Sequence, residues 1–171
     1  MVRKKLSDRA NEWVMYLADT PLGPLRLYFT NRGLTALEFA EDDASPAPEP
    51  NPPPPHLKPL IDAAQRELTA YFAGVPTDFA ALPLDPQGTD FQLQVWQALR
   101  RIPWGQTISY SELARRLGNP KACRAVGQAN AINPIPLIIP CHRVINADGG
   151  LGGYSSGLDR KRWLLRHEGA K

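Results

Sequence analysis

Apolar and polar residues alternate along the first part of the chain and then follow a helical spacing. Over residues 13–40 apolar positions recur at every second residue and are separated by Thr, Pro, Gly and Asn turn residues, which predicts a three-stranded antiparallel meander. From Leu60 to Phe72 the apolar spacing becomes i, i+4, which predicts an amphipathic helix packed on that sheet. No cluster of titratable residues stands out in the meander, so we expect a structural role for it.

Residues 41–56 interrupt this pattern with 7 of the chain's 18 prolines and few apolar groups. Proline removes backbone donors and favours extended geometry, so this stretch is predicted to be a solvated loop. A crossing segment over 80–88 then leads into the second half. We therefore expect an α+β protein with two domains, a structural α/β domain over residues 1–88 and a mostly helical domain over residues 89–171.

The second half has the apolar spacing of short helices. One pattern begins at Thr89 or Asp90 and stops at Pro103, a residue that disfavours helix continuation. Ser109, with Glu112 three residues later, has the sequence of a capping box and predicts the start of another helix.

A tight turn joins that helix to the next one. Gly118 ends the first, and Asn119 with Pro120 offers a capping side chain and a first-turn proline for a helix that runs to Asn130. Two short helices joined in this way predict a helix-turn-helix.

The second helix of this pair carries unusually small side chains. Arg124 is the long group among Ala122, Ala125, Gly127 and Ala129. Such a surface permits close approach to a nucleic-acid backbone or a narrow groove, and a projecting arginine can enter a base stack. A helix packed tightly on another helix favours the same composition, so the spacing leaves both interpretations open.

Candidate chemistry lies where an apolar run over residues 133–140, interpreted as buried and extended, ends at Cys141. His142 and Arg143 follow directly, and a neighbouring base or cation lowers the pKa of a thiol and makes it nucleophilic. Adjacency alone also fits a buried structural cysteine beside a surface histidine. Cys141 is therefore a candidate nucleophile whose assignment depends on the rest of the chain.

Charge is distributed unevenly along the chain. Residues 1–90 hold 8 Lys and Arg against 13 Asp and Glu, whereas residues 91–171 hold 12 against 4, so the two parts carry −5 and +8. A basic half that contains a candidate nucleophile indicates a polyanionic substrate such as nucleic acid, although a solvated basic surface has the same composition. The final basic helix, over 160–168, fits phosphate contact.

Composition excludes several other classes. Apolar runs are far shorter than the roughly 20 residues that span a bilayer, and residues 1–8 lead into no apolar signal core, so we expect a cytoplasmic protein with no membrane partner. Two cysteines, Cys123 and Cys141, form neither a disulfide framework nor a four-ligand zinc site. The glycine-rich segment 148–157 lacks the ordered Gly and Lys of a phosphate-binding loop, which excludes nucleoside triphosphate chemistry.

The motifs of the second half resemble those of the O6-alkylguanine-DNA alkyltransferases, in the order that this family has them. They comprise Phe91, Val95-Trp96, Ile102-Pro103-Trp104-Gly105, Ser109-Tyr110, Leu113-Ala114, Gly118 to Ala122, Arg124 to Gly127, Asn133-Pro134, Pro140 to Val144, Gly152-Gly153-Tyr154, Gly157, Lys161, Leu164-Leu165 and Glu168. Residues 1–90 match only in layout. The resemblance implies DNA repair by irreversible, single-turnover transfer of an alkyl group from O6 of guanine to the protein's own cysteine.

The resemblance also implies roles for the site residues. Cys141 would be the acceptor, His142 would take its proton through a water, and Glu168 would orient the imidazole. Asn133 would brace the turn that holds the cysteine. Tyr110 would donate a proton or a hydrogen bond to the departing guanine.

Contacts with DNA follow from the same resemblance. The second helix of the helix-turn-helix would lie in the minor groove, with Arg124 filling the space that a flipped nucleotide leaves. The residues implied are Lys121, Ala122, Ala125, Gly127 and Ala129 on the DNA side, and Tyr154, Val144, Ser155 and Lys161 around the base.

The implied partner is double-stranded DNA that carries O6-alkylguanine, bound by a monomer, with O4-alkylthymine as an open alternative. No cofactor is implied. Some relatives hold zinc in the N-terminal domain, but residues 1–90 contain no Cys and only His56, so no metal is expected. Cys123 is expected to be a packing residue.

Three other interpretations compete with this one. A non-catalytic lesion sensor of the same fold would lack the acceptor, whereas Cys141 is present. A cysteine hydrolase that used Cys141 and His142 would need an oxyanion hole and leaves the helix-turn-helix unexplained. A transcription regulator would need base-reading side chains, which the second helix lacks.

Overall fold

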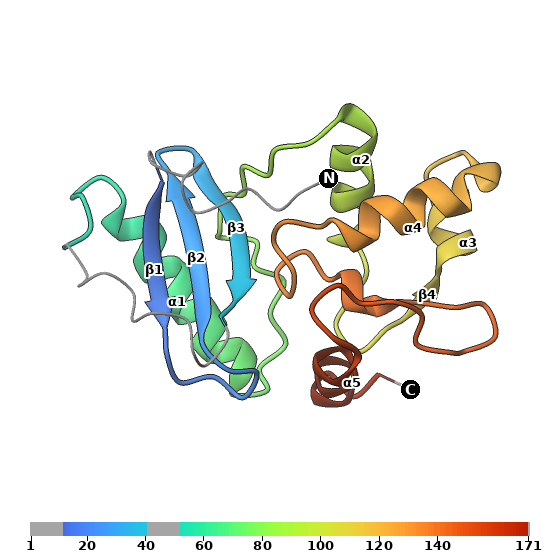
Figure 1. Ribbon diagram of the computed structural model, residues 1–171. Helices are drawn as coiled ribbons and strands as arrows, with labels where there is room; N and C mark the ends of the chain where they lie inside the picture. The colour runs from blue at the N-terminus through green and yellow to red at the C-terminus, as the bar shows by residue number, and fades with distance from the viewer. Residues whose placement is uncertain (1–11, 41–51, 171) are drawn as a thin grey trace.

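The computed structural model describes residues 12–40 and 52–170 and has the α+β architecture expected from the sequence, with a small sheet in one half and a set of short helices in the other (Figure 1). Most of the predicted proline-rich loop, residues 41–51, lies outside the described residues. Within the described ranges no helix is long and apolar enough to cross a membrane.

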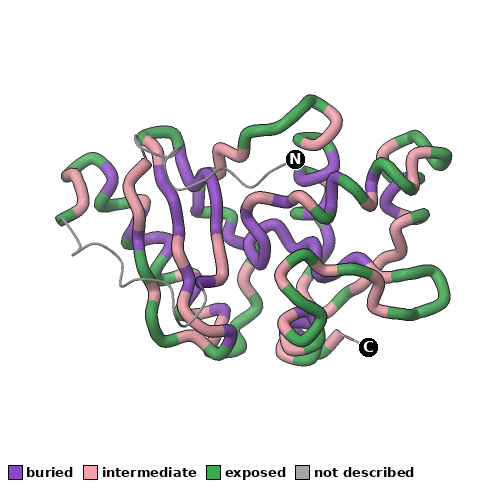
Figure 2. The backbone as a smooth tube through the Cα atoms, viewed as in Figure 1, coloured by how far each residue is buried: buried purple, intermediate pink, exposed green. Residues whose placement is uncertain are grey.

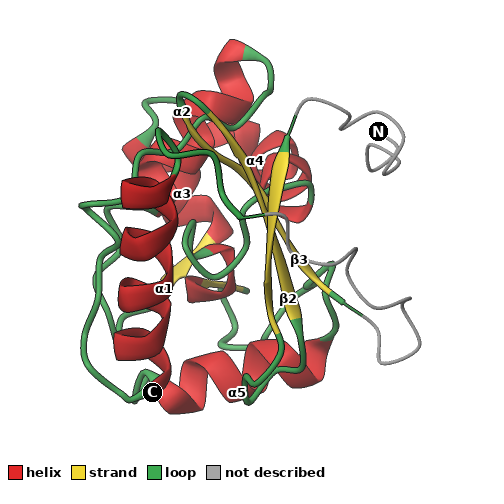
Figure 3. Ribbon diagram, turned by 90° about the vertical axis from the view of Figure 1, so that its left-hand side faces the viewer, coloured by secondary structure: helices red, strands yellow, loops and turns green. Residues whose placement is uncertain are grey.

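The first half is an antiparallel meander covered on one face by a helix. Its elements are β1 (Trp13–Leu17), β2 (Leu25–Thr30), β3 (Gly33–Phe39) and α1 (Lys58–Phe72), with β2 in the centre of the sheet. Leu27 pairs with both Met15 and Leu37, so apolar side chains of all three strands share one face. Helix α1 lies against that face (Figure 3), and its buried residues include Ile61, Ala64 and Leu68.

The second half is built from short helices around one parallel strand pair. Its elements are α2 (Asp90–Leu99), β4 (Ile108–Ser109), α3 (Tyr110–Arg116), a 3-10 turn (Pro120–Ala122), α4 (Cys123–Ala131), a second 3-10 turn (Cys141–Arg143), β5 (Val144–Ile145) and α5 (Leu158–His167). β4 pairs with β5, which brings the start of α3 beside the segment that follows Cys141.

The two predicted helix caps of this half differ in outcome, although α3 begins after Ser109 as expected. Ser109 Oγ accepts a hydrogen bond from the backbone of Glu112 at 3.1 Å, but the Glu112 carboxylate binds Arg115 and Arg116 instead of returning to the cap, so half of the capping box forms. Asn119 makes no side-chain cap, and a 3-10 turn precedes α4. At Ser109 the arginines compete only for the Glu112 carboxylate and the serine cap remains, whereas at Asn119 a tighter turn replaces the cap that the sequence suggested.

The apolar run over 133–140 is not extended, contrary to the prediction. Ile139 N donates to Ile135 O at 2.9 Å, which folds the run back on itself. Asn133 stabilises this turn because its Nδ2 donates to Ile139 O at 2.8 Å and its Oδ1 accepts from Ile135 N at 3.0 Å. An apolar pattern cannot show a turn that one side-chain amide holds together.

The two halves share one hydrophobic core. Buried positions continue from the sheet through the loops in the centre of the molecule to α5 (Figure 2). The β3 edge is covered by other segments, because Leu37 N donates to Pro134 O and Leu34 N donates to Pro83 O, both at 2.9 Å. The meander therefore supports the segment that leads to Cys141.

Candidate active site

Cys141 opens a 3-10 turn and is buried, with 2% of its surface exposed. Its backbone is held on both sides. Cys141 N donates to Ile139 O at 2.7 Å, and Asn130 Nδ2 donates to Cys141 O at 3.3 Å. The turn before Cys141 and the helix α4 thus fix the position of the thiol together.

The environment keeps this thiol protonated at neutral pH. Burial raises the pKa of Cys141 to about 11, and a hydrogen bond with Asn133 and the charge of Lys161 offset only part of the rise. The adjacent Arg143, a candidate source of thiol activation in the sequence, points its guanidinium to Glu168 instead. A base is therefore needed to remove the proton when the thiol reacts.

Glu168 accepts hydrogen bonds from three buried side chains, and we call these four residues the Glu168 cluster. Its Oε1 accepts from Tyr71 Oη at 2.7 Å, from His142 Nε2 at 2.8 Å and from Arg143 Nη2 at 2.9 Å. Its Oε2 accepts from Arg143 Nε at 2.7 Å. Burial alone would raise the pKa of Glu168, but the hydrogen bonds from His142 and Arg143 and the charge of Arg143 outweigh it and hold the pKa well below its usual range. The carboxylate is ionised.

His142 has the protonation state that a base requires. Burial lowers the pKa of its imidazole from the usual 6.5 despite the opposing charge of Glu168, so the ring is neutral at pH 7. Because Nε2 donates to Glu168, the lone pair lies on Nδ1. Nδ1 is buried and has no hydrogen-bond partner among the residues of 12–40 and 52–170. The ring therefore has an unused acceptor next to Cys141 in the chain.

Arg143 is a member of the cluster that the site prediction did not include. It binds both carboxylate oxygens of Glu168, and its Nη1 donates to Ile102 O at 2.6 Å. This bidentate ion pair balances the buried negative charge of Glu168. The position beside His142 was a signal in the sequence, but its acidic partner lies 25 residues away in the chain.

Lys161, predicted to lie around the base, directs its ammonium group at three backbone carbonyl oxygens. The side chain is fully buried, and Nζ donates to the carbonyl oxygens of Val144 at 2.7 Å, Gly153 at 3.3 Å and Leu151. Burial lowers the pKa of Lys161 to about 8. Lys161 thus ties the glycine-rich segment to the strand that follows the Cys141 turn.

Two tyrosines lie close to the thiol. Gly152 has φ +66°, and a Cβ there would lie 3.1 Å from Cε2 of Tyr110, so glycine allows the loop to approach that ring. Burial and the charge of a Cys141 thiolate raise the pKa of Tyr110 and keep its phenol protonated. The same two causes raise the pKa of Tyr154, whose buried Oη has no nitrogen or oxygen partner within the described part of the chain. Ser155, next in the loop, is exposed.

Comparisons with known proteins agree with this arrangement. Residues 14–86 match the family described as 6-O-methylguanine DNA methyltransferase, ribonuclease-like domain, and residues 90–170 match that described as 6-O-methylguanine DNA methyltransferase, DNA binding domain. The chain belongs to the 6-O-methylguanine DNA methyltransferase family. This confirms the resemblance that the motifs of the second half indicated.

Individual relatives extend over nearly the whole chain. The methylated-DNA–protein-cysteine methyltransferase of Methanosarcina acetivorans is 46% identical over 159 residues, which cover 91% of this chain and 99% of the relative. That of Mycobacterium tuberculosis is 48% identical over 150 residues and 88% of each chain. The crystal structure of Mycobacterium tuberculosis OGT in complex with DNA has a TM-score of 0.76 and 45% identity over 92% of both chains. An O6-methylguanine DNA methyltransferase from Methanococcus jannaschii has a TM-score of 0.66 and 28% identity over 92% of this chain and 94% of its own.

In this member of the 6-O-methylguanine DNA methyltransferase family the predicted DNA side of α4 is partly exposed. Its exposed positions follow a helical spacing and comprise Arg124, Ala125 and Gln128, preceded by the exposed Lys121 in the 3-10 turn. Ala122 and Gly127 are half-buried. Gln128 is an exposed polar side chain on this face that the sequence reasoning did not single out.

Ala129 lies in the core and not on the DNA side, which corrects the prediction. Its exposed fraction is 3%, and its carbonyl accepts a hydrogen bond from Trp96 Nε1 at 2.9 Å. The small side chain lets α4 pack closely on α2. The close-packing interpretation of the small residues thus applies to the Ala129 face of α4.

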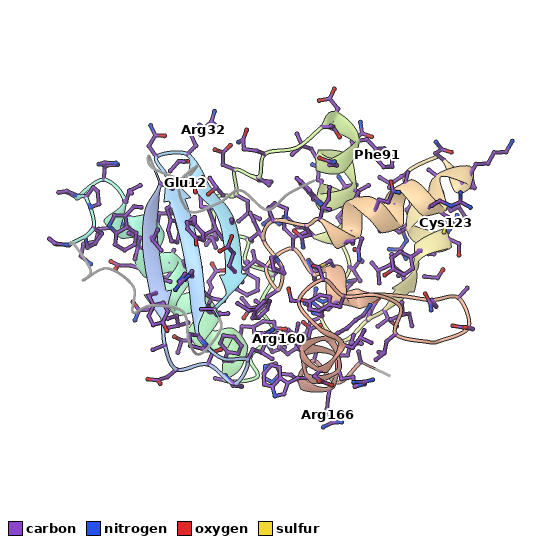
Figure 4. The ribbon with its side chains drawn as sticks, viewed as in Figure 1. Glu12, Arg32, Phe91, Cys123, Arg160 and Arg166 are labelled. Carbon is purple, nitrogen blue, oxygen red and sulfur yellow. The ribbon has the colours of Figure 1, made fainter. Side chains whose placement is uncertain are left out.

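The basic residues of α5 differ in their surroundings: Arg160 contacts the first half of the chain, whereas Arg166 points away from it. Arg160 Nη1 donates to Ser156 O at 2.9 Å, its Nε donates to Leu22 O at 3.3 Å, and its guanidinium lies 4.8 Å from the ring centre of Phe39. In Figure 4 Arg160 lies between α5 and the sheet, whereas Arg166 points away from both. Arg160 therefore joins the two halves instead of presenting a free charge to phosphate.

The sequence reasoning missed Tyr71 and Asn130. Tyr71 belongs to a helix predicted to be only structural, and Asn130 was treated only as the end of a helix. Neither had a sequence signal, because their partners Glu168 and Cys141 lie in distant segments. Within 12–40 and 52–170 no group of three or more His, Cys, Asp or Glu is arranged to hold a metal ion.

Proposed function

We propose that the chain repairs DNA by direct reversal, moving a methyl group from O6 of guanine to Sγ of Cys141 in one irreversible displacement. Membership of the family makes it a methylated-DNA–protein-cysteine methyltransferase that binds DNA. One observation supports Cys141 as the acceptor. Of the two cysteines, it adjoins a buried neutral imidazole whose Nδ1 is unused and whose Nε2 binds an ionised carboxylate.

The proton path starts at the thiol. A water between Cys141 and Nδ1 of His142 passes the thiol proton to the imidazole, and Glu168 stabilises the imidazolium that forms. The sulfur then attacks the methyl carbon, so that the S–C bond forms as the C–O6 bond breaks and its electron pair stays with the guanine.

Tyr110 assists the departing base. Its raised pKa keeps the phenol protonated, so it can donate a hydrogen bond to the guanine as negative charge develops there. The proton released by the thiol ends on a guanine ring nitrogen. The products are a thioether on Cys141 and unmodified guanine, and the protein is consumed because nothing in this sequence of steps restores the thiol.

The base must leave the duplex to reach a buried sulfur. Extrusion of a nucleotide costs a few kcal/mol and is easiest for a poorly paired lesion. The exposed Arg124 fills the space left in the stack, Lys121 contacts phosphate, and Tyr154 and Ser155 surround the flipped base. One chain holds all of these groups, so it acts as a monomer on double-stranded DNA carrying O6-alkylguanine.

Intact-protein mass tests this proposal. After mixing with duplex DNA that contains one O6-methylguanine, the protein is expected to gain one methyl group and no more, whereas Cys141→Ala gains none and still binds the duplex. Cys123→Ala is the matched control and should gain the methyl group normally. Tight binding without a mass change would instead indicate a lesion sensor.

A further inference from the structure

Tyr71 brings the N-terminal half into the Glu168 cluster. It lies in the last turn of α1 and is fully buried. Its Oη donates to Oε1 of Glu168 at 2.7 Å, across 97 positions of sequence. The same oxygen accepts from His142 Nε2 at 2.8 Å. The phenol and the imidazole therefore share one carboxylate oxygen.

The phenol is fixed on several sides. The carbonyl of Tyr71 accepts a hydrogen bond from His167 Nε2 at 2.7 Å, one residue before Glu168 in the chain. Its ring meets Trp104 edge-on with centroids 5.0 Å apart and lies 5.6 Å from the ring of Phe79. These contacts leave the hydroxyl little freedom to turn away from the carboxylate.

The hydroxyl remains a donor throughout the working pH range. Burial and the charge of Glu168 raise the pKa of Tyr71 far above its usual value. The charged groups that face His142 are Glu168, Arg143 and Lys161, so its protonation depends on how much of the carboxylate charge it receives. Each further hydrogen bond donated to Oε1 of Glu168 reduces the negative charge that acts on His142.

We propose that Tyr71 is a positioning residue for methyl transfer: its hydroxyl holds Oε1 of Glu168 against Nε2 of His142 and takes part of the carboxylate charge, which keeps the imidazole neutral and its Nδ1 free to accept the thiol proton. This inference rests on the proposed function. The N-terminal half thereby takes part in the reaction through a side chain that touches neither the thiol nor the base.

Tyr71→Phe removes this hydroxyl and keeps the ring. The matched control is Tyr28→Phe, because Tyr28 is also buried and its Oη donates to Glu38 Oε2 at 2.9 Å within the sheet. The measurements are the second-order rate of methyl transfer from O6-methylguanine duplex between pH 5 and 9, the melting temperature, and the affinity for unmodified duplex.

We expect methyl transfer to the Tyr71→Phe variant to be roughly tenfold slower, since loss of one positioning contact misaligns the imidazole of His142 that acts as the base. The fall in its rate at low pH, the acid limb of the pH profile, should begin at a higher pH, because the full carboxylate charge of Glu168 then acts on His142 and raises the pKa of the imidazole. Affinity for unmodified duplex should not change. The melting temperature of Tyr28→Phe should fall, whereas its rate of methyl transfer and the pH dependence of that rate should not change.

A second variant separates positioning from folding. Site-specific 3-fluorotyrosine at position 71 keeps the ring and hydroxyl but makes the phenol a stronger donor, so the acid limb should move to lower pH, opposite to Tyr71→Phe. An unmoved acid limb in both variants, or a rate loss that follows melting temperature in Tyr71→Phe and Tyr28→Phe alike, would show that Tyr71 is only structural. If the unmutated protein gains no methyl group on Cys141, the proposed function itself is wrong. Intact-protein mass measures this outcome separately from the rates of the variants.

Discussion

Glu168 and Glu112 bind arginines at nearly equal distances but in opposite surroundings. The Arg143–Glu168 pair is 2.7 Å long with side chains 6% and 0% exposed, whereas the Arg115–Glu112 pair is 2.8 Å long with side chains 69% and 28% exposed. Hydrogen bonds from Arg115 and Arg116 lower the pKa of Glu112 to about 2. The pKa of Glu168 is lowered as well, although burial opposes it.

The difference shows that burial, and not distance, decides what such a pair does. On the surface of α3 water screens the charges, and Glu112 joins two neighbours on its own helix. In the interior each lost partner leaves a charge without compensation, so the Glu168 cluster holds one geometry. The buried groups are thus fixed in one geometry, whereas the exposed Glu112 pairs are held only weakly.

Glu168→Gln should have the largest effect on this contrast. It leaves the Arg143 cation buried without a counter-ion, at a cost of about 3–5 kcal/mol, and the melting temperature should fall. It also replaces one carboxylate oxygen with an NH2 donor and removes the negative charge, so the amide no longer fixes the tautomer of His142 or stabilises the imidazolium, and methyl transfer should slow by roughly 100-fold or more. Thermal unfolding and single-turnover kinetics measure the two effects.

Glu112→Gln is the matched control on the exposed side. It removes the same kind of carboxylate from two arginines, but the charges of those arginines remain hydrated. Melting temperature and transfer rate should both stay close to those of the unmutated protein. Equal losses in the two variants would mean that burial does not distinguish the pairs.

Arg124→Ala tests the exposed surface and should affect only substrates that need base extrusion. We expect transfer from duplex DNA to slow by about tenfold or more, because extrusion costs a few kcal/mol that the side chain offsets. Transfer from a single-stranded oligonucleotide and the melting temperature should change little. A similar loss on single strands would assign Arg124 a role other than stabilising the flipped state.

Lowering the pH should slow methyl transfer by protonating the buried His142. Its pKa lies below the usual 6.5, so the neutral imidazole persists to lower pH than in the unfolded chain. As pH falls through that lowered pKa, the rate should drop by about tenfold per pH unit, and the melting temperature should fall too because the unfolded chain binds the proton more readily. A rate that rises on acidification would contradict the role of His142 as the base.

Lys121→Ala should have the smallest effect. An exposed lysine that contacts one phosphate contributes about one unit to the slope of log affinity against log salt, and its loss weakens binding equally for all sequences. Salt titrations of duplex binding measure this slope. Lys58→Ala is the control, because Lys58 is exposed on α1 and binds Asp62, and its loss should leave the slope unchanged.

Sequence patterns were most informative where neighbours in the chain decide the structure. The meander, the paired helices around Gly118 and the adjacency of Cys141 and His142 could all be predicted, because turns, helical spacing and adjacency are local. The pattern was misleading over 133–140, where a side-chain amide bends an apolar run, and at Ala129, whose small side chain lies in the core.

By itself the sequence indicated most of the helices and strands, the family, and the candidate thiol and imidazole with Glu168 as the partner of the imidazole. Only the tertiary structure decided that Arg143 shares Glu168 with His142, that Tyr71 from the other half binds the same oxygen, and that Ala129 faces inward. The physical reason is that the protonation of a buried group depends on solvent exclusion and on charges within a few ångströms. Those surroundings are assembled from segments as far as 97 positions apart.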